Sequence, residues 1–445
     1  MSEAPPRPPA APLRGRAARV LRAAAGLAAA FADGLETAGW RPAATAAWRR
    51  SLKPALARRA AKPAPAATAA ATAAPLREGV LFAGYAEGSL GLGQSLRLDL
   101  KAVEPTGLDF AVHPVSAGIE TRRAGPFMAE RTDRSGRYPV TLVEVASDQL
   151  PTVLAEIGPA RLVGSRLILR TYWELPRAPA AWAPHLAGVS EIWAPTRFVA
   201  DAFAGVFEGP IRHVPPAMEV PSLDAEGEPF ALPPGRFHFL FSFDYFSYPT
   251  RKNPLGVIRA FRDAFPPTRG DVGLVVKSNG EAGHHPDVRT AMEAQAREDG
   301  RIRLVHGEIG RPAMLGLLRA ADAYVSLHRS EGFGQGMAEA MLFAKPVIGT
   351  DYSGSTDFLT HETGFPVSYR LRPVAPGEYA WSAGQSWAEP DHEAAVEAMR
   401  FVADHPDEAR RRGETARRSL AARYGLDPVG LVLARRLGAL LAEAS

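Results

Sequence analysis

Short apolar segments alternate with amphipathic segments through the first half of the chain. Between about residues 79 and 215 the apolar segments cover positions 80–84, 110–113, 140–145, 167–170, 191–194 and 212–215, with helical stretches between them. This alternation predicts a parallel sheet with helices on both faces. Sheets of this kind bind ligands outside the carboxyl ends of their strands.

The alternation stops in a proline-rich stretch between Pro215 and Gly235 and then resumes. Strands are expected at 237–243, 273–277, 302–306 and 323–327, and helices at 254–265, 288–297, 312–320, 337–343, 394–403 and 431–441. The proline-rich stretch is typical of an interdomain linker. The chain is therefore predicted to be α/β, with an extension at 1–78, a first doubly wound domain at 79–215 and a second at 216–426.

The extension is rich in Ala, Pro and Arg. Val20, Ala24, Leu27 and Phe31 recur at helical spacing, and a basic amphipathic helix can lie on an anionic membrane, so residues 13–62 are a candidate membrane contact. The same composition equally fits a disordered extension. A signal peptide is a third interpretation, against which Arg22 and the weak hydrophobicity count.

Charge and cysteine content exclude several classes of function. The net charge is +4, but residues 1–77 carry +10, so the remainder carries −6, which argues against a nucleic-acid-binding core. The absence of cysteine excludes disulfides and thiolate nucleophiles. No apolar run approaches the roughly 20 residues that span a bilayer. His284 and His285 lack further spaced ligands, so no metal site is predicted.

The stretch from Ser326 to Met341 contains the strongest candidate chemistry. A buried strand is expected to end near Leu327, a glycine-rich turn to follow, and a helix to begin near Met337. The free N–H groups and positive dipole of a helix N-terminus form a receptor for phosphate or sugar oxygens. Glu331, before the helix, and Glu339, on it, can hold two parts of one extended ligand.

Further polar groups follow other predicted strands. Arg251 and Lys252 stand where the first strand of the second domain meets a helix, a junction that suits a diphosphate, although a solvated basic pair is the alternative. Ser353 and Gly354 begin another turn whose N–H groups can meet the sugar or phosphate.

The first domain offers a loop and two carboxylates. The loop at 84–95, with Gly91 and Gly93, matches a dinucleotide loop imperfectly. Asp148 follows the third strand and is either an acceptor-side carboxylate or the N-cap of a helix near Leu150. Glu174 follows the fourth strand beside two aromatic residues, and the alternative is an aromatic packing corner with Glu174 exposed.

Residues 79–445 resemble retaining glycosyltransferases of the GT-B fold, family 4, also called glycosyl transferases group 1, because Glu331 and Glu339 match their E-x7-E motif. The resemblance implies two Rossmann-like domains facing across a cleft, with the helix at 427–445 packing back on the first domain. It also implies that Glu331 contacts the sugar hydroxyls and Glu339 the ribose.

The resemblance assigns further roles around the cleft. It implies that Lys252 and the backbone of Gly332, Phe333 and Gly334 stabilise the leaving diphosphate, and that Gly91 and Gly93 face it. Two departures stand out: the family's phosphate-binding arginine falls near Ser247, and its acceptor-side histidine is absent. Arg251 and Glu174 are the candidate replacements.

The expected function is a retaining, metal-independent transfer of a hexosyl unit from a nucleotide sugar, with UDP or GDP favoured and no cofactor. The acceptor is expected to be a glycan or a lipid-linked molecule in surface polysaccharide or glycoconjugate assembly. The location is expected to be cytoplasmic, with a peripheral position on the inner face of the cell membrane as an alternative. Rival functions are a nucleotide-sugar epimerase and a non-catalytic, membrane-associated binding subunit; a glycan phosphorylase would need a pyridoxal lysine motif that the chain lacks.

Overall fold

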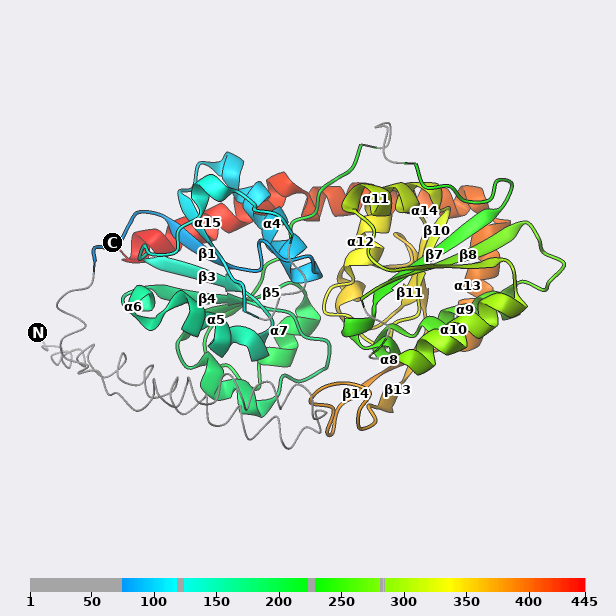
Figure 1. Ribbon diagram of the computed structural model, residues 1–445, viewed down its shortest axis with the longest axis horizontal. Coiled ribbons are helices and arrows are strands. Elements are labelled where there is room, and N and C mark those ends of the chain that lie inside the picture. The colour runs from blue at the N-terminus through cyan, green and yellow to red at the C-terminus, as the bar shows by residue number, and fades with distance from the viewer. Residues whose placement is uncertain (1–73, 118–123, 223–228, 281–282, 284, 445) are drawn as a thin grey trace, which may run out of the picture.

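The computed structural model describes residues 74–117, 124–222, 229–280, 283 and 285–444. Two parallel six-stranded sheets lie side by side, each covered by helices (Figure 1). This confirms the prediction of two doubly wound sheets. The expected amphipathic helix around Val20 and the candidate membrane contact at 13–62 lie outside the described residues.

The first sheet has the strand order β2-β1-β3-β4-β5-β6. Its strands are β1 Val80–Gly84, β2 Phe110–Pro114, β3 Val140–Glu144, β4 Arg166–Arg170, β5 Val189–Ala194 and β6 Ile211–His213. All residues of β1, β2 and β3 are buried, which explains their continuous apolar sequences. The parallel register aligns Gly84, Glu144 and Arg170 at one edge, facing the second sheet.

The second sheet has the strand order β12-β11-β10-β7-β8-β9. Its strands are β7 Phe237–Asp244, β8 Val272–Asn279, β9 Ile302–His306, β10 Ala323–Ser326, β11 Val347–Thr350 and β12 Phe365–Val367. A core that includes Phe239, Phe261 and Val325 fills one of its faces.

Helices connect the strands of both sheets. The α-helices are α4 Gly91–Val103, α5 Leu150–Ile157, α6 Pro159–Leu162, α7 Arg197–Phe203, α8 Pro249–Lys252, α9 Pro254–Ala264, α10 Pro286–Glu298, α11 Arg311–Ala320, α12 Gln335–Leu342, α13 His392–Asp404, α14 Pro406–Tyr424 and α15 Leu426–Ala444. The short 3-10 helices are η1 Glu104–Thr106, η2 Ala129–Arg131, η3 Ser147–Gln149, η4 Ala180–Leu186, η5 Tyr245–Ser247 and η7 Ser353–Asp357. Among the described residues, no helix has the length and apolarity needed to cross a bilayer.

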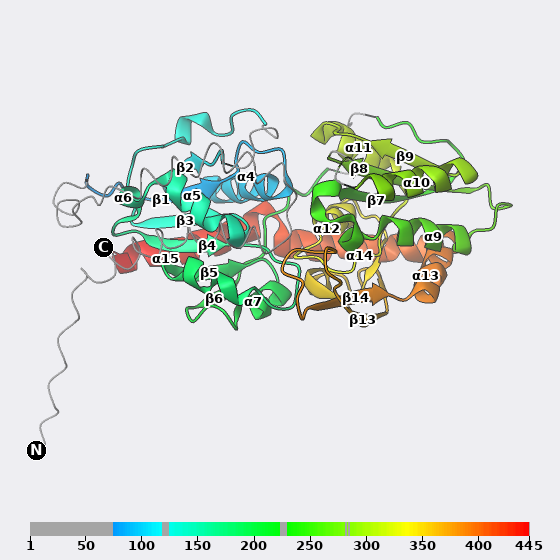
Figure 2. The same cartoon turned by 60° about the horizontal axis from the view of Figure 1, so that its bottom comes forward.

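The last helix, α15, returns from the second sheet to the first (Figures 1 and 2). Leu433, Leu437 and Leu440 are buried in one cluster with Leu96 and Leu100 of α4. The apolar face of α15 therefore packs in the core of the first domain, whereas α14 packs in the core of the second.

The helix expected at 394–403 is present as α13, and a strand that was not expected lies directly before it. This strand, β14 Ser386–Pro390, pairs antiparallel with β13 Tyr369–Pro373, and Asp391 caps α13, accepting from the Ala394 N–H at 3.0 Å. The strand forms because Trp387 is fully buried in a cluster with Trp173 and Trp182 of the first domain.

Candidate active site in the interdomain cleft

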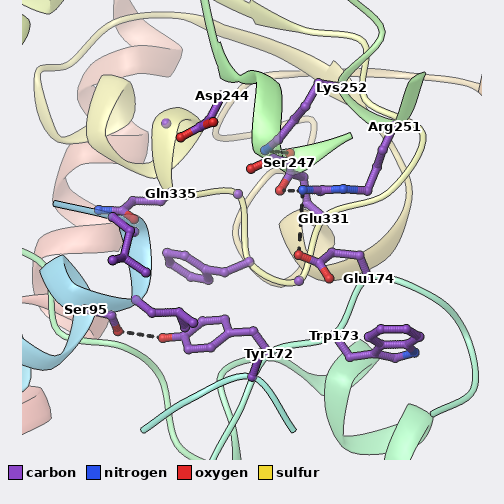
Figure 3. A pocket seen from close by; sticks show the side chains of 18 of the residues that line it. Ser95, Tyr172, Trp173, Glu174, Asp244, Ser247, Arg251, Lys252, Glu331 and Gln335 are labelled. Atoms are coloured by element: carbon purple, nitrogen blue, oxygen red, sulfur yellow. Dashed lines mark hydrogen bonds and ion pairs between the residues drawn. The ribbon is translucent and has the colours of Figure 1, made fainter. Parts of the chain in front are cut away.

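A cavity of about 490 Å³ lies between the facing edges of the two sheets. Loops from both domains line it, as Figure 3 shows for Glu174 of the first domain and Arg251 of the second. The β13–β14 connection lines it too. The predicted site residues that line it are Gly91, Asp148, Glu174, Arg251, Lys252, Glu331, Gly332, Phe333 and Gly334. The cleft therefore gathers residues that lie up to 243 positions apart, between Gly91 and Gly334.

Glu331 lies between two cations of the short helix α8. Arg251 Nη1 is 3.1 Å from Glu331 Oε2, and Lys252 Nζ contacts Glu331 Oε1. Adjacent helical residues ordinarily point in different directions, yet both side chains reach one carboxylate (Figure 3). Tyr248, before α8, has φ 58°, and Asn253, after it, also has φ 58°, so α8 is a single turn set by its flanks.

The backbone around Glu331 is held by the loop after β11. The Glu331 N–H donates to Ser353 Oγ at 2.8 Å, and the Gly354 N–H donates to the Glu331 carbonyl at 2.9 Å. Ser353 and Gly354 do not line the cavity. The two residues that were expected to contact the donor therefore support Glu331 from behind.

Opposing effects set the charge of Glu331. Burial alone would raise the pKa of its carboxyl, but the charges of Lys252 and Arg251 together outweigh burial and lower the pKa to about 2. Burial lowers the pKa of Lys252, although Glu331 opposes that change. The result is an ionised carboxylate and a guanidinium in a site largely closed to water.

Glu174 faces this cluster from the first domain. One of its carboxylate oxygens accepts a hydrogen bond of 2.6 Å from the Tyr379 hydroxyl, and the other lies 3.7 Å from Arg251 Nη2. Both partners belong to the second domain, so Glu174 is not an exposed residue at a packing corner. Arg251 thus connects the carboxylate expected on the donor side with the carboxylate expected on the acceptor side.

Asp148 lies in η3 and lines the same cavity. Its side chain does not cap α5, whose N-terminus has no side-chain hydrogen bond. Burial raises the pKa of Asp148, and the charge of Glu174 adds to the shift. Of its two expected roles, the structure favours the cavity over the helix cap.

Gly93 and Glu339 lie behind the cavity wall. A side chain at Gly93 would meet the carbonyl oxygens of Tyr85 and Gly88 at 2.5 Å, so this glycine serves the close packing of its own loop. Glu339 Oε1 is 2.9 Å from Arg311 Nη1 and accepts from Gln335 Nε2 at 3.1 Å. Gln335, and not Glu339, lines the cavity.

Gly332 brings the two domains together. A Cβ atom at this position would lie 3.2 Å from the Trp173 carbonyl oxygen, and Thr196 donates a hydrogen bond of 2.9 Å to the Gly332 carbonyl. Thr196 also caps α7 by accepting from the Val199 N–H. The small residue therefore permits a close contact between domains in addition to lining the cavity.

Sequence reasoning missed four further contributors to the site. They are Tyr248, Tyr379, Trp381 and Arg311. Tyr379 and Trp381 stand two positions apart in a segment with several Pro and Gly residues, a pattern of aromatic residues in a loop that would have indicated a binding role. Among the described residues, no group of three or more His, Asp or Glu side chains is placed to hold a metal ion.

Residues 247–419 match the family model of glycosyl transferases group 1. This match covers less than half of the chain and falls on the part that contains Lys252, Glu331 and Glu339. Among curated proteins, no sequence matches this chain.

Solved structures show the fold of the whole described region. HepE of Anabaena, in complex with UDP and glucose, has a TM-score of 0.56 at 14% identity, covering 81% of this chain and 100% of HepE. The sucrose-phosphate synthase of Thermosynechococcus elongatus has a TM-score of 0.57 at 16% identity, covering 82% and 100%. A glycosyltransferase of Rickettsia africae has a TM-score of 0.55 at 12% identity, covering 82% and 99%. The fold is GT-B, and together with the family match it supports a glycosyltransferase.

Proposed function

We propose that the protein is a retaining glycosyltransferase that transfers a hexosyl unit from a nucleotide sugar to a glycan or lipid-linked acceptor, without a metal ion. The observation that carries this proposal is the convergence of Lys252 and Arg251 on Glu331 in the interdomain cavity, opposite Glu174. The cluster offers positive charge for a diphosphate and carboxylates for sugar hydroxyls within one site.

The donor diphosphate would be stabilised on the second-domain side. The α12 N-terminus, reached through Gly334 at φ 98°, presents free N–H groups to the cavity that Lys252 also lines. A diphosphate would compete with Glu331 for Lys252, while the more deeply buried Arg251 would stay with its carboxylates. Negative charge grows on the diphosphate as the glycosidic bond breaks, so these fixed charges act on the transition state.

Retention of configuration would come from attack on the face that the diphosphate leaves. The bond from the anomeric carbon to the phosphate oxygen breaks, with its electron pair leaving on the diphosphate. The bond from the anomeric carbon to the acceptor oxygen forms, and the acceptor proton passes to the departing diphosphate. Glu331 is a poor candidate for a covalent nucleophile, because a carboxylate whose pKa is about 2 is weakly basic and is neutralised by two cations.

The donor base is proposed to be uracil or guanine, with uracil first because the HepE structure holds UDP. The test is incubation of the full chain with UDP-, GDP- and ADP-sugars, followed by chromatography of the released nucleotide. Release of UDP or GDP is expected. An isomerised sugar without nucleotide release would indicate an epimerase instead, and no change in any donor would indicate a binding subunit.

We propose from residues 13–62 alone that the protein lies peripherally on an anionic membrane. Its proposed role there is surface polysaccharide or glycoconjugate assembly. Their basic amphipathic pattern supports attraction to anionic headgroups in the cytoplasm, where nucleotide sugars are made. Sedimentation with phosphatidylglycerol vesicles should retain the full chain at low salt and release it at high salt. Equal retention of a chain that begins at residue 74 would contradict the assignment.

A further inference from the structure

The β13–β14 hairpin is an addition to the two parallel sheets and is firmly attached to the second one. Glu389 on β14 accepts hydrogen bonds from Arg329 at 2.8 and 2.9 Å and from Arg372 at 2.8 Å. Arg372 also bonds both carboxylate oxygens of Glu378, at 2.7 and 2.9 Å. These paired contacts fix the start of the 374–385 connection, which therefore presents its side chains from a defined position.

The 374–385 connection reaches the first domain beside the cavity. Gln385 Nε2 donates to the Arg177 carbonyl at 2.7 Å, and Tyr379 donates to Glu174. The ring of Trp381 meets that of Trp182 edge to face, with centroids 6.2 Å apart. Tyr379, Ala380 and Trp381 thereby form one wall of the cavity, next to Glu174.

Two aromatic residues that line the cavity, one of them on this wall, have unfavourable backbone conformations. Tyr248 has φ 58° and Trp381 has φ 57°, values that non-glycine residues rarely adopt. The ring centroids of Tyr248 and Tyr379 are 4.6 Å apart, and the residue Trp381 remains 46% exposed. Burial of apolar surface therefore does not explain the position of Trp381, and conformations of this kind cluster at ligand-binding sites.

The chemistry of this wall fits a sugar ring. A pyranose presents a face of C–H groups, which packs on an aromatic ring, and an edge of hydroxyls, which donate to carboxylates. Trp381 supplies the ring, and Glu174 and Asp148 supply carboxylates in the same cavity. Saccharide hydroxyls can donate to the acceptor positions that Glu174 and Asp148 keep in addition to their protein contacts, which an apolar chain cannot do.

We propose that the 374–385 connection is the acceptor-binding element, and that it takes a saccharide whose ring packs on Trp381 while its hydroxyls bond to Glu174 and Asp148. This inference rests on the proposed glycosyltransferase function and narrows its acceptor to a carbohydrate. Trp381 then determines acceptor specificity and takes no part in binding the donor.

The experiment measures nucleotide release from the donor with and without a panel of saccharides, namely methyl glycosides and disaccharides of glucose, galactose, mannose and N-acetylglucosamine. At least one saccharide is expected to accelerate release by the wild-type chain. Trp381→Ala should raise the KM for that saccharide about 10-fold or more, with a smaller change in kcat, because one stacking surface is lost. Trp381→Phe, which keeps a ring, should recover most of the affinity.

Leu371→Ala is the matched control, because Leu371 lies on the same hairpin, is 60% exposed and does not line the cavity. It should behave as the wild-type chain does, and melting temperatures of all variants check that each is folded. Donor release that no saccharide accelerates, or an unchanged KM in Trp381→Ala, would overturn the inference while leaving the proposed function intact. Absence of donor release from the wild-type chain would instead overturn the proposed function, and the inference with it.

Discussion

Glu331 and Glu144 are buried carboxylates, and their surroundings shift their pKa values in opposite directions. Two cations lower the pKa of Glu331 to about 2, so its interactions stabilise the fold at neutral pH and are lost as the pH falls below 4.5 toward 2. Burial, followed by the charge of Asp99, raises the pKa of Glu144 to about 8. Glu144 and Asp99 share one buried cation, Arg170, so one carboxyl must remain protonated to keep the cluster neutral.

Glu144→Gln is expected to stabilise the protein at alkaline pH. The folded-state pKa of Glu144 is raised, so the stability that it contributes is present below about pH 4.5 and is lost as the pH rises toward 8. The variant should match the wild-type chain at pH 5 and exceed its free energy of unfolding at pH 9 by on the order of 1 kcal/mol or more. Denaturant unfolding at both pH values measures this difference.

Glu298→Gln provides the control for this measurement, because Glu298 forms an exposed ion pair with Arg262. Its effect should be small at both pH values. A Glu144→Gln variant that is less stable than the wild-type chain at pH 9 would show that the ionised carboxylate stabilises the folded protein, which would contradict the raised pKa of Glu144.

Single residues could be predicted from the sequence where a local pattern fixes them. Glu331 lies between a buried strand and a glycine-rich turn, so its place in the cleft was predictable. Its partners were less so, because the convergence of Arg251 and Lys252 depends on the conformations of Tyr248 and Asn253, both with φ 58°. The role of Arg311 beside Glu339 depends on the packing of α11 against α12, which no local pattern shows.

At the scale of elements, the β13–β14 hairpin holds Glu174, the proposed acceptor-side carboxylate. Tyr379→Phe removes the hydrogen bond to Glu174 but keeps the ring against Trp173. Hydrogen bonds to charged groups contribute about 1.5–3 kcal/mol, so transfer should fall roughly 10-fold or more in kcat/KM. Initial rates at varied acceptor concentration measure the loss. Tyr369→Phe, on the outer strand of the same hairpin, should leave the rate unchanged, and an equal loss in both variants would contradict the role of Tyr379.

Elements with continuous apolar sequences were predictable, and the hairpin was not. Every strand of the first sheet falls within about two residues of an expected apolar segment, and in β1, β2 and β3 the reason is that burial on both faces requires such segments. Residues 387–391 contain a genuine helix start at Asp391, which masks the strand before it. The strand depends on Arg329 and on the aromatic cluster around Trp182, which are distant in sequence.

At the scale of the molecule, α14 and α15 join the two domains. A Cβ atom at Gly430 would lie 2.1 Å from the Ala102 carbonyl oxygen, so α15 lies very close to α4. Gly430→Ala should therefore separate these helices and cost about 1–3 kcal/mol of the free energy of unfolding. At Gly438 on the same helix nothing lies within 4 Å, and Gly438→Ala should be neutral or stabilising by up to about 1 kcal/mol. Thermal unfolding compares the two, and equal effects would contradict the close contact.

The two-domain arrangement was predictable from the linker and the two alternating patterns, together with the resemblance. The way in which the domains close on each other was not, because it depends on contacts between distant segments. Thr196 with Gly332 and Tyr379 with Glu174 are examples. These contacts complete the cavity from both sides, so the proposed acceptor half of the site depends on the assembled molecule.

The central claim is that the protein cleaves a nucleotide sugar in this cleft by means of Glu331, Arg251 and Lys252. The most direct test compares nucleoside diphosphate release by the wild-type chain and by Glu331→Gln, which keeps the size of the side chain and avoids leaving a void beside Arg251 and Lys252. We predict that the wild-type chain releases the nucleoside diphosphate and that the release rate of the variant is lower by a factor of about 100 or more. Equal rates in the two proteins would contradict the account.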